Sequence, residues 1–325
     1  MTTASLNKPL TLPCGTILPN RIAKAAMSEH LGSPNQSPTR GLARLYERWS
    51  AGGAGLLITG NVMIDPAHLE GVRNVAVKPE SNVDRFREWA IAGTTHGNVV
   101  SRFLSPLTNQ RSDRWGGSLE HRARFARTVL GEVRKAVGDD FPVSIKLNSA
   151  DFQRGGFTEE ESMRVLGMLQ EDGVDLVEIS GGSYESRVML DKVESQREAF
   201  FLEYAKKARA EVDIPMMVTG GFRARSIMED ALSTGALDVV GMGRPFTNNP
   251  SVAQDLIDGR TEWAEDPPVM PGLRRLGGMS EAMMSVAQMG LLAKGKSPTL
   301  RLGGLGAVFG SLVQETADLF RPKPR

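Results

Sequence analysis

Two glycine-containing segments near the end of the chain carry the residues best suited to bind an anion. One contains Gly220 and Gly221, the other contains Gly243 and Arg244, and each lies between a predicted strand and a predicted helix. Glycine lets backbone N–H groups approach an anion closely, and a helix N-terminus adds positive potential. The Arg244 guanidinium can bind a phosphate through two parallel hydrogen bonds. The segments therefore predict a phosphate site, although the glycines could instead serve tight turns and Arg244 could pair with a neighbouring helix.

Two other predicted strands end in residues that could contact a ligand. Lys146 lies near the end of a short apolar strand, where its ammonium could stabilise negative charge on a ligand. The alternative is a lysine that reaches solvent or pairs internally. Ala26, Met27 and Ser28 end the first strand with small or flexible side chains and one hydroxyl. Such residues suit a flat aromatic ring, and equally suit ordinary packing.

Short apolar runs alternate with longer segments of helical periodicity, which predicts βα units around a parallel sheet. The predicted strands are Arg21–Met27, Gly55–Gly60, Pro142–Leu147, Val174–Ile179, Pro215–Thr219 and Asp238–Met242. The predicted helices are Pro38–Ala51, Ser81–Thr95, Leu119–Val137, Thr158–Asp172, Glu198–Val212, Ala224–Thr234, Ser251–Asp258 and, in the tail, Met279–Leu292. Thr158 and Glu161 have the spacing of a capping box, which fixes one helix start.

Six strands are fewer than the eight of a closed (β/α)8 barrel. The shortfall is local, because the interval between Gly97 and Leu119 has room for one short strand, such as Val99–Leu104, and not for two strands and a helix. We therefore predict a TIM (β/α)8-type barrel that lacks about two strands, the third and fourth. We place the barrel at residues 1–262, with an internal deletion near 98–101, and a C-terminal helical extension at 263–325.

Charge and cysteine content exclude several function classes. The chain has 325 residues, with 39 Lys plus Arg against 38 Asp plus Glu, so no strong field favours nucleic acid or an anionic membrane. Cys14 is the only cysteine, which excludes intrachain disulfides and fits a reducing, cytoplasmic location. The histidines are scattered and show no metal-ligand spacing, so we expect no metal site. The expected partner is a small-molecule substrate.

Two segments resemble the old yellow enzyme family of NADH:flavin oxidoreductases. The first runs from Asn20 to Ser28, and the second is the specific run Phe103–Glu120, FLSPLTNQRSDRWGGSLE. The resemblance extends from about Leu6 to Gly259. It implies a TIM barrel that binds FMN, accepts hydride from NADH or NADPH and passes it to an activated alkene such as an enone.

The resemblance also implies roles for single residues. Ala26, Met27 and Ser28 would lie along the flavin, with the Ser28 hydroxyl near the reactive part of the ring. Gly60 would contact the ring through its backbone, and Lys146 would lie near the pyrimidine side of the flavin. The implied phosphate-binding residues are Gly220, Gly221, Gly243 and Arg244, the same four that the glycine segments indicate without the resemblance.

The chain departs from the family where the substrate should bind. The family has a strand with a flavin-contacting glutamine, a helix, and a strand bearing a histidine pair followed by tyrosine, and here Gly97 is followed almost directly by Ser101. The family's histidine pair polarises the substrate carbonyl and its tyrosine donates a proton. Both are absent, so the catalytic residues are unknown and alkene reduction should be impaired. The alternative is a non-catalytic or unstable truncated barrel that at most binds FMN or phosphate.

Overall fold

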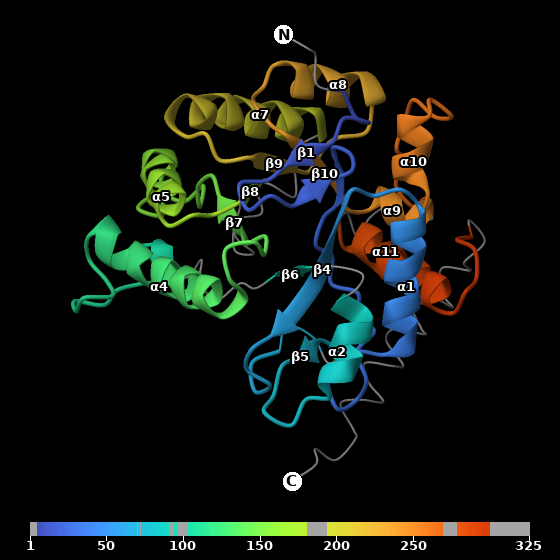
Figure 1. Cartoon of the computed structure of the whole chain (residues 1–325), viewed down its shortest axis with the longest axis horizontal. Helices are drawn as coiled ribbons and strands as arrows, with labels where there is room; N and C mark the ends of the chain where they lie inside the picture. The colour runs from blue at the N-terminus through green and yellow to red at the C-terminus, as the bar shows by residue number, and fades with distance from the viewer. Residues whose placement is uncertain are drawn as a thin grey trace. The chain divides into compact units, whose positions relative to one another are not determined.

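The computed structural model describes residues 5–69, 71, 73–90, 94–96, 103–180, 194–268 and 278–299. The chain forms two compact units, each built from two stretches of sequence. The first unit comprises Met1–Ala23 and Asn98–Met242, and the second comprises Lys24–Gly97 and Gly243–Arg325. Figure 1 shows both units and labels most of their helices and strands. No described helix is both long and apolar enough to cross a membrane.

A parallel sheet forms the centre of the first unit. Its strands are β3 (Ile22–Lys24, whose last residue begins the second unit), β7 (Ser144–Asn148), β8 (Leu176–Ser180), β9 (Met216–Thr219) and β10 (Val239–Met242). The order across the sheet is β3-β10-β9-β8-β7, and β7, β8, β9 and β10 pair in parallel. A short antiparallel hairpin, β1 (Leu10–Thr11) and β2 (Ile17–Leu18), precedes the sheet.

Strands β3 and β10, the first and last of this sheet in chain order, are neighbours. The amide of Val240 in β10 donates a 2.8 Å hydrogen bond to the carbonyl oxygen of Arg21, the residue before β3. The Arg21 side chain also contacts the last strand, because it donates to the carbonyl oxygen of Asp238 at 3.1 Å. Contact between the first and last strands of a βα series is the arrangement that a barrel requires.

Four helices alternate with the strands of the first unit: α4 (Leu119–Val137), α5 (Glu159–Glu171), α7 (Glu194–Glu211) and α8 (Arg225–Ser233). The predicted capping box is confirmed, since the Thr158 hydroxyl accepts from the Glu161 amide and the Glu161 carboxylate accepts from the Thr158 amide. Ser118 caps α4 in the same way by accepting from the His121 amide. These caps satisfy N–H groups that have no partner within the helix.

The second unit contains a second group of parallel strands and its own helices. Strand β4 (Leu56–Met63) pairs in parallel with both β5 (Val75–Ala76) and β6 (Thr94–His96). The helices are α1 (Arg40–Ala51), α2 (Val83–Ala90), α9 (Pro245–Asn248), α10 (Val252–Ile257) and α11 (Gly278–Ala293). Helix α11 packs against α1 and α9, as Figure 1 shows for the red and blue helices. The tail helix predicted at Met279–Leu292 is therefore confirmed.

All six predicted strands are present, and three details of the prediction are wrong. The helix predicted at Ser81–Thr95 ends at Ala90, and Thr94–His96 forms β6 instead. The reason is local, because a glycine followed by two β-branched threonines disfavours helix continuation. Phe103 and Leu104 are helical, so the end of the strand predicted at Val99–Leu104 is wrong, and residues 99–102 lie outside the described residues. Finally, the strand predicted to end at Gly60 continues to Met63, so Gly60 lies inside β4.

Candidate functional site

Lys146 and Glu178 form an ion pair between two adjacent strands of the first unit, and each is the middle residue of its strand. The residues face each other in the register of β7 and β8, and the Lys146 Nζ lies 2.8 Å from the Glu178 Oε1. The Glu178 side chain is 5% exposed, whereas the Lys146 side chain is 25% exposed. The carboxylate is thus buried and the ammonium remains accessible. This arrangement leaves a partly exposed cation on the sheet that a ligand can reach.

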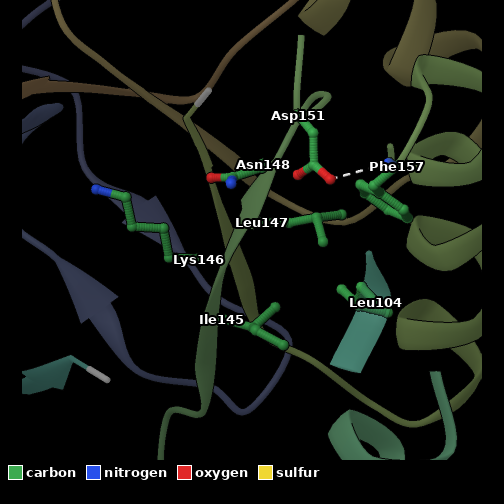
Figure 2. A pocket seen from close by; sticks show the side chains of 7 residues that line it. All are labelled: Leu104, Ile145, Lys146, Leu147, Asn148, Asp151 and Phe157. Atoms are coloured by element: carbon green, nitrogen blue, oxygen red, sulfur yellow. Dashed lines mark hydrogen bonds between the residues drawn. The ribbon is translucent and has the colours of Figure 1, made fainter. Parts of the chain in front are cut away.

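The two faces of β7 differ in chemistry. Figure 2 shows Lys146 on one side of the strand, with Leu147, Leu104 and Phe157 on the other. The second group lines a small pocket together with Asp151, whose carboxylate accepts a 2.9 Å hydrogen bond from the Phe157 amide. Alternation along a strand sends successive side chains to opposite faces. Lys146, Ile145 and Asn148 line the same pocket, so this pocket lies along β7 and has Lys146 among its lining residues.

The predicted phosphate-binding glycines of the first unit lie between β9 and α8. Gly220 and Gly221 have φ values of +115° and +85°, a backbone region that disfavours residues with a Cβ. Helix α8 has Ala224 at its N-cap, with no side-chain hydrogen bond to the first amides. The Thr219 hydroxyl just before the glycines is buried and finds no hydrogen-bond partner among the described residues. Uncapped amides and an unpaired hydroxyl beside a glycine turn fit an anion-binding loop.

In the second unit the structure brings Met27 together with two of the predicted glycines. A Cβ on Gly60 would collide with the carbonyl oxygen of Met27 and with the Glu29 carboxylate. A Cβ on Gly243 would lie 3.3 Å from the Met27 Cγ and 3.4 Å from its Sδ. The Ser28 hydroxyl accepts a long, 3.4 Å hydrogen bond from the Asn61 amide group. Glycine at position 60 is therefore required because the segment after β3 approaches β4 closely.

A buried polar cluster lies directly behind this segment. The Lys24 Nζ donates to the Tyr46 hydroxyl at 2.9 Å and to the Ile58 carbonyl oxygen at 2.8 Å, and lies 3.5 Å from the Glu29 Oε1. The Glu29 carboxylate also accepts hydrogen bonds from the Tyr46 hydroxyl and from the Gly60 amide. Burial, followed by the nearby Glu29 charge, raises the pKa of Tyr46 well above its usual value. The Gly60 N–H is thus already paired within the protein, and the ring contact assigned to Gly60 stays a prediction.

Arg244 lies at the start of α9 and pairs with two carboxylates of the tail. Its guanidinium is 3.2 Å from Asp266 and also contacts Glu281 of α11. About a quarter of the side chain is exposed. Within the second unit this arginine therefore acts as an internal ion-pair partner, the alternative that the sequence left open. Its role as a phosphate ligand stays a prediction.

Sequence reasoning missed three residues of these clusters, namely Lys24, Glu29 and Glu178. A usable signal existed for two of them. Lys24 interrupts the apolar first strand, and Glu178 interrupts the apolar run Val174–Ile179, so each charge had to find a partner inside the sheet. Glu29 follows the first strand and gave no such signal. The partners themselves depend on strand register, which these short runs do not reveal.

Comparison with known proteins identifies the family. Residues 90–262, about half of the chain, match the NADH:flavin oxidoreductase / NADH oxidase family. The NADH-dependent flavin oxidoreductase iliE of Hypocrea jecorina is 28% identical, covering 77% of this chain and 88% of its own length. NADH-dependent flavin oxidoreductase nadA of Aspergillus parasiticus is 27% identical over 84% of this chain and 82% of its own. The Hypocrea alignment extends over 355 residues, so that relative contains residues without counterparts in this chain.

Solved structures share the fold. The old yellow enzyme homologue from Zymomonas mobilis has a TM-score of 0.66 at 15% identity and covers 81% of this chain and 95% of its own. Morphinone reductase in complex with tetrahydroNAD has a TM-score of 0.61 at 18% identity and covers 82% of this chain and 93% of its own. A 2-naphthoyl-CoA reductase has a TM-score of 0.70 at 21% identity, and this chain spans about half of its length, 53%.

The resemblance and the cofactors that it implies are confirmed together. The family is defined by flavin chemistry with NADH, which makes FMN the cofactor and NADH or NADPH the reductant. The barrel-type βα order and the old yellow enzyme neighbours agree with the expected fold class. The chain therefore belongs to the NADH:flavin oxidoreductase / NADH oxidase family.

Proposed function

We propose that this chain is an FMN-dependent oxidoreductase that passes hydride from NAD(P)H through FMN to an activated alkene of the enone or enal type. The observation that carries the proposal is that one unit contains both an accessible ammonium, Lys146, and a loop at Gly220 and Gly221 that suits an anion. Two similar proteins are named cinnamate reductase and morphinone reductase, after conjugated compounds. These names support this acceptor class.

The chain's own residues would divide the work of binding FMN. The amides after Gly220 and Gly221, with the Thr219 hydroxyl, supply donors for a phosphate. Lys146 supplies positive charge for the pyrimidine side of the ring, where negative charge accumulates on reduction. In the second unit Ala26, Met27 and Ser28 offer small, flexible and hydroxyl-bearing surfaces, and Gly243 and Arg244 are proposed for the same cofactor. FMN, when bound, supplies the hydride acceptor and donor.

Alkene reduction places a hydride on one carbon and a proton on the other, so a proton donor is needed. The histidine pair and tyrosine of the family are absent from the sequence, which supports impaired transfer to the acceptor. The alignment with the Hypocrea relative extends over 355 residues, whereas it includes only 77% of this 325-residue chain. An internal deletion in this chain would produce such a difference. The proposed junction near 98–101 lies outside the described residues, and one boundary between the units falls there, at Gly97 and Asn98. We therefore infer flavin reduction with slow delivery to the alkene.

The test uses the full chain incubated with FMN, desalted, and examined by visible absorbance before and after anaerobic NADH. We expect retained flavin that loses colour with NADH and recovers it slowly when 2-cyclohexenone is added as the acceptor probe. Loss of all flavin on desalting would contradict the proposal. Bleaching by NADH without any recovery on the enone would contradict the acceptor class alone and favour a cofactor-binding remnant.

A matched pair of glycine variants sharpens this test. Gly220→Ala and Gly235→Ala both place a Cβ at positive φ in open space, at +115° and +70° respectively. Each should cost about 1–2 kcal/mol of folding free energy from the left-handed backbone. Only the Gly220 variant lies before the start of α8, so only it should weaken FMN retention. Equal FMN affinity in the two variants would remove the phosphate role of the glycine loop.

A further inference from the structure

Glu178 is a buried carboxylate inside an otherwise apolar strand. Its neighbours along β8, Val177 and Ile179, are fully buried. Across the sheet it faces Lys146 on one side and the apolar Met217 on the other. A buried carboxylate is costly unless it is paired, and here the pairing atom is the Lys146 Nζ at 2.8 Å. The position of Glu178 therefore fixes where the ammonium must lie.

The side chain of Lys146 is partly paired inside the protein and partly exposed. Its ammonium contacts Glu178, and a quarter of the side chain remains exposed, on the side of β7 away from Leu147 and Phe157 in Figure 2. An ammonium has three N–H donors, so two remain for other partners after the bond to Glu178. The geometry thus presents a cation whose orientation is set, and whose charge is partly offset, by a carboxylate that is 5% exposed.

We propose that Glu178 is a positioning residue for Lys146 that lowers the reduction potential of bound FMN. This inference rests on the proposed function, in which Lys146 lies at the pyrimidine side of the ring. Hydride transfer from NADH, which leaves as NAD⁺, adds two electrons and one proton to the neutral ring and so adds one negative charge. A free ammonium would stabilise that charge, and a carboxylate 2.8 Å from the ammonium offsets most of the effect.

The substitution Glu178→Gln separates charge from structure. Its amide oxygen can still accept a hydrogen bond from Lys146, whereas the negative charge is lost. We expect reduced FMN to gain about tenfold in affinity relative to oxidised FMN, which is a rise of about 30 mV in the two-electron potential. A residue that only supports the strand would alter stability or overall affinity and leave this ratio unchanged.

The experiment measures the midpoint potential of the FMN-loaded full chain by equilibration with a reference dye, alongside FMN affinity by fluorescence quenching. The matched control is Glu132→Gln, which removes the same charge from an exposed glutamate paired with Lys135 at 2.7 Å. We expect the potential to rise in the Glu178 variant and to stay at the wild-type value in the control. Glu178→Asp, which keeps the charge and moves it away from Lys146, should give a smaller rise and serves if the glutamine variant does not fold.

The outcomes distinguish the inference from the function on which it rests. A wild-type chain that retains no FMN overturns both. FMN binding with an unchanged potential in folded Glu178→Gln overturns the role of Glu178 and leaves the proposed function intact. An equal rise in Glu132→Gln would show a general charge effect and would also overturn it.

Discussion

The two units each contain a lysine paired with a glutamate, and the two pairs differ in how completely the protein surrounds them. In the second unit the side chains of Lys24 and Glu29 are 0% and 6% exposed. The Lys24 ammonium also bonds the Tyr46 hydroxyl and a carbonyl oxygen, and lies 4.4 Å from the centroid of the Trp49 ring. In the first unit the side chain of Lys146 is 25% exposed, and it pairs with Glu178.

This difference separates a structural cluster from a ligand-accessible one. Every donor of the Lys24 ammonium has a protein partner or an aromatic face nearby, so the cluster can hold the segment after β3 and has no capacity for a ligand. Lys146 keeps a quarter of its side chain accessible. Buried ionic groups add little net stability, yet their loss is costly because the remaining charge is stranded. The same residue types thus serve two purposes, depending on burial.

The largest effect should come from breaking the enclosed cluster. Glu29→Ala removes the group that accepts from Lys24, Tyr46 and Gly60, and leaves a buried ammonium without its counter-charge. We expect a loss of about 3–5 kcal/mol in the free energy of unfolding, measured by urea titration. Glu178→Ala should cost clearly less, because the accessible Lys146 can be hydrated. Equal losses would mean that burial does not distinguish the two pairs.

Alkaline pH should weaken both units through buried tyrosines. Burial raises the pKa of Tyr204 to about 12, and burial together with Glu29 raises the pKa of Tyr46. Below pH 10.0 tyrosine is neutral in both states and the stability is fully present. Above it the unfolded state ionises first, so stability should fall by up to about 1.4 kcal/mol per pH unit for each tyrosine.

Phenylalanine variants test this pH dependence. Tyr204→Phe should remove the part of the loss that falls between pH 10.0 and about 12. Tyr46→Phe should likewise flatten the curve, at the cost of a hydrogen bond from Lys24 at neutral pH. Thermal unfolding from about pH 8 to about 12 provides the measurement. Unchanged pH curves in both variants would show that other groups cause the alkaline loss.

The close approach beside Met27 should tolerate no added methyl group. Gly60→Ala places a Cβ against the backbone oxygen of Met27, and we expect it to cost about 1–3 kcal/mol, typical of overpacking. The control in the same unit is Gly290→Ala in α11, where a Cβ meets open space and helix propensity favours alanine by up to about 1 kcal/mol. A neutral Gly60 variant would mean that the segment after β3 can move aside.

The smallest effect concerns Arg244 and the tail. Glu281→Gln should weaken the hold on the Arg244 guanidinium, because it removes the charge of a tail carboxylate that pairs with it. A partly exposed ion pair contributes at most about 1 kcal/mol, so FMN should bind about two- to fivefold more tightly in this variant. Fluorescence quenching measures the affinity, and Glu265→Gln, a neighbouring tail carboxylate, is the control. Weaker FMN binding after loss of Glu281 would argue against a phosphate role for Arg244.

Much of the fold could be predicted from local sequence. The capping box at Thr158 and Glu161, the helix at Leu119–Val137 and the six main strands follow from spacing and apolar periodicity, which act over a few residues. The short strands β1, β2, β5 and β6 were missed, since runs of two or three residues carry no periodicity. The family resemblance came from a contiguous run, Phe103–Glu120, which needs no tertiary information.

The sequence by itself determined the βα order, the helix caps, the glycine turns and the family. Only the tertiary structure decided which charges meet. Lys146 and Glu178 are 32 residues apart and pair because β7 and β8 are aligned in one register, and a shift by one residue would separate them onto opposite faces. Lys24, Glu29 and Tyr46 meet because a strand, a loop and a helix pack around one buried point. Periodicity specifies which face of an element is buried, and packing specifies its partners.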